Sequence, residues 1–231
     1  MRVLFSTTPL DGHFRPLLPL AHALRARGHE VAFATAASWH GHVEAEGFPA
    51  LAAGASHKVA MARRLDGQRE AVARMPPLGR RHYVFSYLFA EGHAPLKLSD
   101  LLEAARAWKP DAVVFEAADL AAPIVAAALG VPAVHHAFGT LAPPAALERA
   151  GEAAAPLWRQ AGLEPDRYGG AFLGLYVDVV PPALDGDPPL GERVRLRPAL
   201  DAAGGRPAWL GELARPLVYA TMGTVFNKPE S

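Results

Sequence analysis

The sequence contains no cysteine. This absence excludes a disulfide framework, a cysteine nucleophile and a thiolate metal site. It also fits a reducing compartment, so we expect a cytoplasmic protein. Lysine is scarce too, with four lysines against nineteen arginines. That ratio is typical of a GC-rich coding sequence, and we infer no function from it.

An excess of charge of one sign is also missing. Lys and Arg number 23, Asp and Glu number 23, and the formal net charge is zero. Such a chain has no broad positive field of the kind that sequence-independent nucleic-acid binding needs, so we expect no nucleic-acid partner.

Long apolar runs are absent as well. The run 3–5 is too short for the core of a secretion signal. The most apolar later stretch, 120–134, contains Pro123, Gly130 and Pro132 and is shorter than the ~20 residues of a membrane-spanning helix. We therefore expect neither a secretion signal nor stable membrane insertion. Because 51% of the residues are hydrophobic, the chain can still bury a substantial globular core.

Three nucleotide or hydrolase motifs are missing. The first predicted turn after a strand, TTPLDGHFRPLLP, has one glycine, whereas a dinucleotide-binding turn needs Gly-x-Gly-x-x-Gly so that the backbone can approach a pyrophosphate. The sequence contains no Gly-Lys-Ser or Gly-Lys-Thr of a P-loop, and no Gly-x-Ser-x-Gly of a nucleophile elbow.

What the sequence does contain is an alternation of short apolar runs and helical segments. This order is typical of a parallel sheet with helices on both faces, so we predict an α/β fold with a doubly wound, Rossmann-like parallel sheet. The segment 53–109 lacks a clear pattern, and there we expect irregular helices. The expected strands are 2–7, 31–35, 48–52, 112–115, 132–137 and 176–180, and the expected helices are 16–27, 38–46, 119–129 and 144–160.

The composition changes near residue 180. Prolines and paired glycines become frequent, which indicates a linker. We predict a first domain at 1–180, a linker at 181–214, and the first strand of a further domain at 215–231, with the strand itself at 216–220.

His13 is the first candidate for chemistry, because it lies between the first strand and the first expected helix. Ligands of open parallel sheets bind beyond the carboxyl ends of the strands where the strand order reverses. The positive end of a helix dipole lowers the pKa of a nearby imidazole, which favours a neutral His13 that accepts a proton as a general base. The alternative is an ordinary loop or capping residue.

Two carboxylates are candidates for a partner of His13. Glu116 lies at the carboxyl end of the expected strand 112–115, and Asp119 follows at the start of the next helix. Either can orient the imidazole and stabilise the imidazolium after proton transfer. We favour Glu116 because Asp at a helix N-cap is common for structural reasons alone.

Other residues have a functional and a structural interpretation. Phe85 and Phe89 line an apolar acceptor cavity or simply pack in a core. A metal at His40 and His42 is disfavoured because residues two apart on a helix point to different sides. At most one of His135 and His136 reaches the crevice, because neighbouring strand residues face opposite ways.

Three segments resemble one family. They are RVLFSTTPLDGHFRPLLPLAHALRARGHEVAFAT, PDAVVFEAADLAAPIVAAALGVPAVHHAFG and RPLVYATMGTVFN. They are similar, in this order along most of the chain, to GT-B glycosyltransferases of the nucleotide-sugar-dependent family one, above all the bacterial enzymes that modify macrolides and other antibiotics.

The resemblance implies roles for individual residues. His13 is then the catalytic base, and Glu116 its acidic partner where many relatives have Asp; the substitution keeps the charge and moves it outward by one methylene. Gly223 and Thr224 match a loop near the donor phosphates. The family's acceptor side lies in the first domain, and there we place Gly12, Phe14, Phe85, Phe89 and Phe138.

The resemblance also implies an inverting transfer of a sugar from a nucleoside diphosphate sugar to a hydroxyl of an apolar natural product. It implies no metal and no other cofactor, and it places nucleotide binding in a second domain beyond Ser231. The alternative is a non-catalytic helper subunit that binds the acceptor and assembles with a separate donor-binding chain. A homodimer is a further arrangement to test.

Overall fold

The computed structural model contains one large and one small unit, 1–197 and 198–231. The residues it describes are 1–65, 70, 74–76, 79, 83, 85–184, 191–197, 207–213 and 216–220. In the small unit, the described residues include one short 3-10 helix, η5 (Ala208–Gly211).

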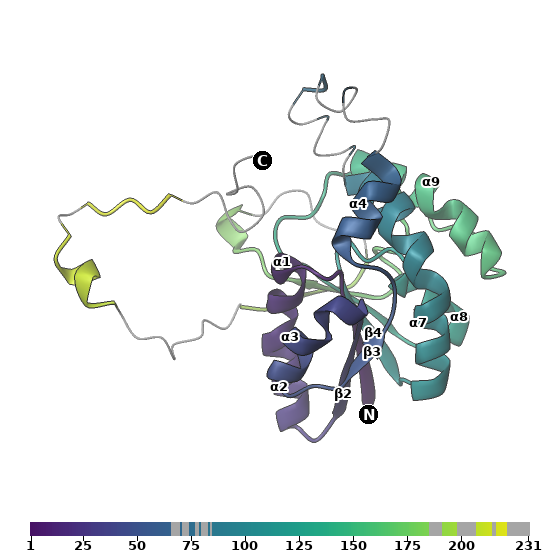
Figure 1. The fold of residues 1–231 in the computed structure, drawn as a ribbon, viewed down its shortest axis with the longest axis horizontal. Helices are drawn as coiled ribbons and strands as arrows, with labels where there is room; N and C mark the ends of the chain where they lie inside the picture. The colour runs from purple at the N-terminus through teal and green to yellow at the C-terminus, as the bar shows by residue number, and fades with distance from the viewer. Residues whose placement is uncertain are drawn as a thin grey trace. The chain divides into compact units, whose positions relative to one another are not determined.

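A seven-stranded sheet forms the centre of the large unit (Figure 1). All neighbouring strands are parallel, in the order β3-β2-β1-β4-β5-β6-β7. This arrangement confirms the predicted doubly wound α/β fold, and the strand order reverses between β1 and β4. The strands are β1 (Arg2–Ser6), β2 (Glu30–Thr35), β3 (Ala50–Ala52), β4 (Ala112–Glu116), β5 (Ala133–His136), β6 (Leu175–Asp178) and β7 (Arg193–Arg195).

The last strand corrects one expected boundary. We placed 181–214 in a linker, but β7 pairs in parallel with β6, so the large unit continues to Arg197. A three-residue strand flanked by polar and proline-rich sequence has too little pattern to be recognised. The strand expected at 216–220 is also not found: these described residues form no strand, because a strand needs a paired neighbour and none of the described residues provides one.

One face of the sheet is covered by the helices of the first 46 residues (Figure 1). The helix expected at 16–27 begins earlier and consists of three pieces. The breaks coincide with Pro16 and Pro19, which lack the backbone N–H that an uninterrupted helix requires. The pieces are α1 (Asp11–Phe14), η1 (Arg15–Leu17) and α2 (Leu18–Ala26), followed by η2 (Ala37–Trp39) and α3 (His40–Ala45).

Helices α7 and α8 pack on the opposite face, with α9 beside them (Figure 1). Part of the segment 53–109 is more regular than expected, because α7 is an uninterrupted helix of 15 residues, capped by Lys109 in the left-handed conformation. The elements on this side are α4 (His57–Leu65), the π-helical segment η3 (Phe85–His93), α7 (Ala94–Trp108), α8 (Ala122–Leu129) and α9 (Pro144–Gln160).

Successive residues of β1 point to opposite faces of the sheet and so pack in two different cores. Val3 and Phe5 belong to the core under α1 and α2, whereas Leu4 belongs to the core under α7 and α8. Since both faces are buried, the middle of the strand, residues 3–5, is apolar. The polar residues that follow β1 and β4 therefore lie at the carboxyl edge of the sheet.

Candidate active site

The site lies where β1 and β4 end, on either side of the switch point. Ser6 ends β1, the loop 7–10 follows, and α1 contains His13. Glu116 ends β4. Because Ser6 lies opposite Phe115 in the parallel register, the residues that follow both strands meet at one edge of the sheet.

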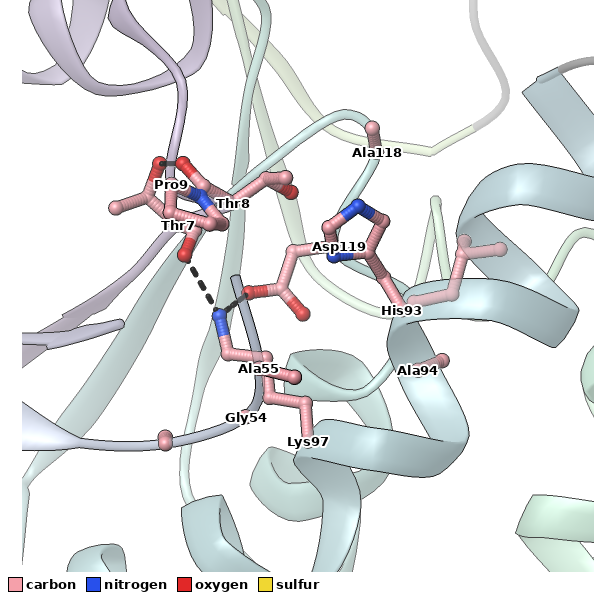
Figure 2. A pocket seen from close by; sticks show the side chains of 12 residues that line it. Thr7, Thr8, Pro9, Gly54, Ala55, His93, Ala94, Lys97, Ala118 and Asp119 are labelled. Carbon is pink, nitrogen blue, oxygen red and sulfur yellow. Dashed lines mark hydrogen bonds and ion pairs between the residues drawn. The ribbon is translucent and has the colours of Figure 1, made fainter. Parts of the chain in front are cut away.

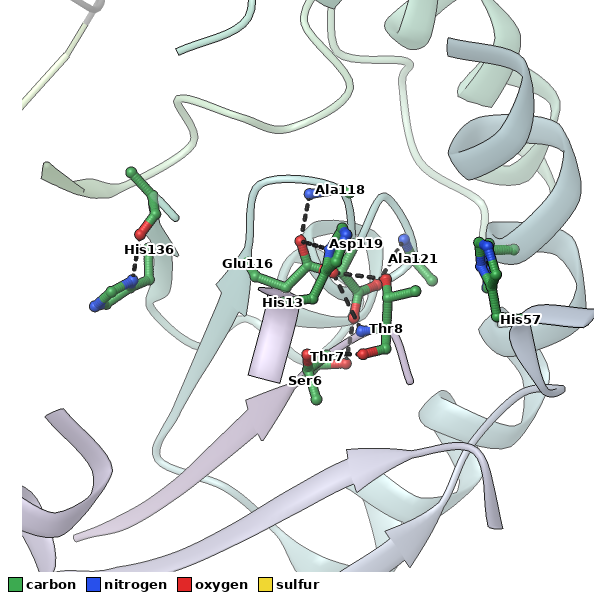
Figure 3. Close-up of polar contacts among 12 residues, drawn as sticks. Ser6, Thr7, Thr8, His13, His57, Glu116, Ala118, Asp119, Ala121 and His136 are labelled. Carbon is green, nitrogen blue, oxygen red and sulfur yellow. Dashed lines mark hydrogen bonds and ion pairs between the residues drawn. The ribbon is translucent and has the colours of Figure 1, made fainter. Parts of the chain in front are cut away.

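His13 and Glu116 are in contact. The Nδ1 atom of His13 lies 3.0 Å from Oε2 of Glu116, whose side chain is fully buried. The backbone N–H and the hydroxyl of Thr8 donate hydrogen bonds of 3.1 and 2.6 Å to Oε1, and the backbone N–H of Ala118 donates one of 2.6 Å to Oε2 (Figure 3). The extra methylene of glutamate therefore does not prevent the contact.

Burial and the Glu116 carboxylate act in opposite directions on His13. Burial lowers the pKa of His13, but the charge and proximity of Glu116, helped by Asp119, outweigh burial and raise the pKa above 6.5. Burial raises the pKa of Glu116, yet His13, Thr8 and Ala118 together lower it to about 2. Glu116 is thus a carboxylate at neutral pH.

The expected effect of a helix dipole on His13 is wrong. We placed His13 ahead of a helix that lowers its pKa, but α1 begins at Asp11 and His13 is its third residue. The adjacent Glu116 carboxylate determines the direction of the shift.

Asp119 contacts a lysine. Its Oδ2 lies 2.6 Å from Nζ of Lys97 and accepts a hydrogen bond of 2.6 Å from the hydroxyl of Ser6. Its Oδ1 accepts bonds from the backbone N–H groups of Ala121 and Ala122, at the start of α8. Of the two candidate carboxylates, the structure brings Glu116 to His13, and it gives Asp119 the helix-start role that we considered its structural alternative.

Lys97 is a site residue that the sequence did not lead us to predict. It lies in the first turn of α7 with its side chain 8% exposed, and its ammonium also donates a hydrogen bond of 2.9 Å to the carbonyl of Thr7 (Figure 2). One signal was available: it is one of four lysines in an arginine-rich chain.

Aromatic rings surround His13. Its ring lies 5.4 Å from that of Phe89 and 4.7 Å from that of Phe138, and Phe85 lies 5.7 Å from Phe89. Phe138 is exposed, whereas Phe89 is buried in the core. Two of the residues expected on the acceptor side, Phe89 and Phe138, therefore lie next to the imidazole, and a third, Phe85, lies next to Phe89.

The other two residues expected on the acceptor side, Gly12 and Phe14, are not part of this aromatic group. Phe14 is buried in the core under α1, with its ring 5.2 Å from that of Phe33. The assignment of Phe14 to the acceptor side is thus corrected: adjacent residues of a helix point in different directions, and only His13 faces Glu116. Gly12 is exposed, and a Cβ there would touch nothing within 4 Å.

Two histidines, His57 and His93, form a pair next to Phe89. Nδ1 of His57 is 3.0 Å from Nε2 of His93, and the His93 ring lies 5.6 Å from that of Phe89. Burial lowers the pKa of both imidazoles, that of His93 to about 3, so both are neutral at pH 7. The spacing of Phe85, Phe89 and His93 by four residues is the signal that sequence analysis missed.

His93, Lys97 and Asp119 line a narrow pocket between the loop after β1 and α7 (Figure 2). Its volume is about 10 Å³, enough for about one water molecule. Within the described part of the chain, no three His, Asp or Glu residues are grouped as metal ligands. His42 instead stacks on Trp39 at 3.9 Å.

Gly223 and Thr224, which the resemblance matches to a loop near the donor phosphates, lie outside the described residues. His135 and His136 are both buried, and their Nδ1 atoms bond to the carbonyls of Ala171 and Ala137. Among the helices described, none is long and apolar enough to cross a membrane.

Comparison with known proteins gives the family. Residues 22–190 match the family described as "Erythromycin biosynthesis protein CIII-like, N-terminal domain". The chain belongs to this family. Over 97% of its length it is 32% identical to elloramycin glycosyltransferase ElmGT of Streptomyces olivaceus, and over 97% it is 31% identical to L-demethylnoviosyl transferase of Streptomyces niveus. The aligned regions are 58% and 57% of these relatives, so the chain spans little more than half their length.

Solved structures of glycosyltransferases agree with the fold. Glycosyltransferase SsfS6 of Streptomyces sp. SF2575, in complex with thymidine diphosphate, has a TM-score of 0.68 and 27% identity over 93% of this chain and 58% of its own. The spinosyn rhamnosyltransferase SpnG, in complex with spinosyn aglycone, has a TM-score of 0.64 and 26% identity over 90% of this chain and 53% of its own. The predicted kinship with antibiotic glycosyltransferases is confirmed.

Proposed function

We propose that this chain is the acceptor-binding part of an inverting glycosyltransferase, in which His13 removes the proton from an acceptor hydroxyl. The observation that supports this proposal most directly is the contact between His13 and a fully buried, ionised Glu116 at the switch point of the sheet. Open parallel sheets bind their ligands at this position.

The contact determines which imidazole nitrogen reacts. Because Nδ1 of His13 faces Glu116, Nε2 is left for the acceptor. In the proposed step the acceptor O–H bond breaks and its proton moves to Nε2, while the oxygen forms a bond to the anomeric carbon. The bond from that carbon to the nucleoside diphosphate breaks, and the leaving group takes the electron pair. A single displacement inverts the anomeric centre, and Glu116 stabilises the imidazolium.

The surroundings of His13 favour an apolar acceptor. The rings of Phe89 and Phe138 adjoin the imidazole, and ligand pockets of this kind combine apolar walls with a few placed polar groups. The complex of SpnG with spinosyn aglycone supports a natural product of that chemical class. The complex of SsfS6 with thymidine diphosphate supports a nucleoside diphosphate sugar as the donor.

The test is activity in a two-part enzyme. The chain is joined to the C-terminal half of ElmGT, and sugar transfer is measured with that relative's own donor and acceptor. His13→Ala should lower kcat by ~10²- to 10⁴-fold with little change in acceptor affinity, because a positioned general base is lost. An unchanged kcat in His13→Ala would refute the base assignment. If the chain raises the activity of the separate half without needing His13, it is a helper subunit instead.

A further inference from the structure

Lys97 occupies a position that is costly for a cation. Its side chain is buried on α7, a helix that continues directly from η3. Removing an ammonium from water is unfavourable unless its hydrogen bonds are replaced. The chain uses arginine almost everywhere else, so a specific geometric requirement explains this lysine better than a general need for charge.

The structure holds the ammonium in one place. Nζ lies 2.6 Å from Oδ2 of Asp119 and donates a hydrogen bond of 2.9 Å to the carbonyl oxygen of Thr7 (Figure 2). The aliphatic part packs against Gly54, where a Cβ would lie 3.1 Å from that of Lys97. Gly54 also has a φ of +84°, so a glycine lets the loop after β3 close over the lysine.

The carbonyl that Lys97 contacts belongs to the same peptide unit as the amide that contacts Glu116. The C=O of Thr7 accepts from the ammonium, and the N–H of Thr8 donates 3.1 Å to Oε1 of Glu116. The Thr7–Thr8 peptide therefore lies between a cation and an anion. Bonding a cation to the carbonyl polarises the peptide and strengthens its N–H as a donor.

We infer that Lys97 is a positioning residue, whose ammonium fixes and polarises the Thr7–Thr8 peptide so that this peptide holds the Glu116 carboxylate against His13. The chain of contacts runs from Lys97 through one peptide to Glu116 and then to His13. Its catalytic consequence rests on the proposed function, whereas the peptide contact does not.

A purely structural ion pair is the competing explanation. A buried ion pair can usually be replaced by apolar residues at little cost, because the desolvation of the two charges offsets their attraction. That explanation gives no role to the Thr7 carbonyl. It predicts that loss of Lys97 affects Asp119 and the packing of α7 and leaves the amide of Thr8 as it was.

Loss of Lys97 should also change the pKa of His13, because several charged residues lie around this histidine. Glu116 and Asp119 raise the pKa of His13, and Lys97 lowers it. The pair His57 and His93 interacts with His13 as well, but its lowered pKa values keep it neutral. Removing Lys97 should therefore raise the pKa of His13.

The test is NMR of the 231-residue chain, with the amide protons of Thr8 and Ala118 as reporters. Both donate to Glu116, but only the Thr8 amide belongs to the peptide that Lys97 contacts. In Lys97→Met the Thr8 amide proton should move upfield because its hydrogen bond weakens, and the imidazole of His13 should titrate at higher pH.

Asp119→Asn is the matched control. It removes a charge from the same network but leaves the ammonium on the Thr7 carbonyl, so the Thr8 amide should keep its position. If Lys97→Met does not fold, the pair Lys97→Met with Asp119→Leu leaves no unpaired buried charge and should show the same upfield shift. A Thr8 amide that stays in place without Lys97, or that moves equally in Asp119→Asn, would overturn the inference.

The catalytic consequence is measured in the two-part enzyme. Lys97→Met should lower kcat by up to ~10²-fold through misplacement of the reacting groups, with KM little changed. Lys58→Met removes a charge from an exposed position of α4 and should leave kcat unchanged. A normal kcat in Lys97→Met, together with a shifted Thr8 amide, would overturn the positioning role. Full activity of His13→Ala would instead refute the proposed function.

Discussion

His135 should make the stability of the chain fall as the solution becomes mildly acidic. It lies on β5, 2% exposed, with Nδ1 2.9 Å from the carbonyl of Ala171. Nε2 has no hydrogen-bond partner within the described residues, so a second proton would leave a buried N–H unpaired. Burial outweighs the bond to Ala171 and lowers the pKa of His135 from 6.5 to about 4.

The sign and size of the effect follow from this pKa. In the unfolded chain His135 takes up a proton near pH 6.5, whereas in the folded chain it does so near pH 4. The folded state therefore loses stability as the pH falls through this window. At pH 5, about 1.5 units below the unfolded pKa, the loss is about 2 kcal/mol at 1.36 kcal/mol per unit.

The assay is urea denaturation at pH 7.5 and at pH 5, with His135→Phe as the comparison. Phenylalanine keeps a ring beside Phe115, which lies 5.4 Å from the imidazole, but it cannot take up a proton. Any pH-independent change in the free energy of unfolding caused by the substitution cancels, because each protein is compared with itself at the two pH values. Wild type should lose about 2 kcal/mol more than His135→Phe. Equal losses in both proteins would refute the reasoning.

Four further outcomes are expected. In the two-part enzyme the rate should rise with pH through a His13 pKa that Glu116 raises, and Glu116→Gln should move this rise to lower pH while costing less in maximal rate than His13→Ala. Asp119→Asn should cost less than Glu116→Gln; the opposite order would reverse our choice of carboxylate. Calorimetry on the chain alone should show weak binding of an apolar hydroxyl-bearing aglycone and none of a nucleoside diphosphate sugar; tight nucleotide binding alone would contradict the domain assignment. Gly174→Ala should lower the free energy of unfolding by about 1–3 kcal/mol, because a Cβ there would clash with the carbonyl oxygen of Ala133, whereas Gly41→Ala, with nothing near its Cβ, should not.

The fold was predictable because its signals are local and repeated. Buried apolar runs such as Leu4–Phe5 and helix ends such as Gly130, at φ +65°, each indicate their own element, and the alternation of elements indicates a parallel sheet. The failures lie where the signal is short or nonlocal. The three residues of β7 have no pattern of their own, and the pieces of the first helix depend on where Pro16 and Pro19 interrupt the hydrogen bonding.

The position of the candidate site was predictable from the sequence, but its electrostatic interactions were not. The strand order brings the residues after β1 and β4 together. This is why His13 and Glu116 could be predicted as partners from the sequence. The direction of the His13 pKa shift was not, because it depends on the distance between two side chains and on their burial. Lys97 is 90 residues from Thr7 in the sequence, and only the packing of α7 brings its ammonium to the Thr7 carbonyl.

The charge balance of the site explains why a buried imidazole can act as a base there. With His13 neutral, the buried group contains two carboxylates, Glu116 and Asp119, and one cation, Lys97, which leaves a net negative charge in a region shielded from water. A proton on His13 neutralises this group, so the transfer of a proton from an acceptor hydroxyl relieves an unfavourable charge. The histidines behind Phe89 add no charge at neutral pH because burial lowers their pKa values. The surroundings thus favour the imidazolium that the proposed reaction produces, and an isolated histidine in the same loop would not have that advantage.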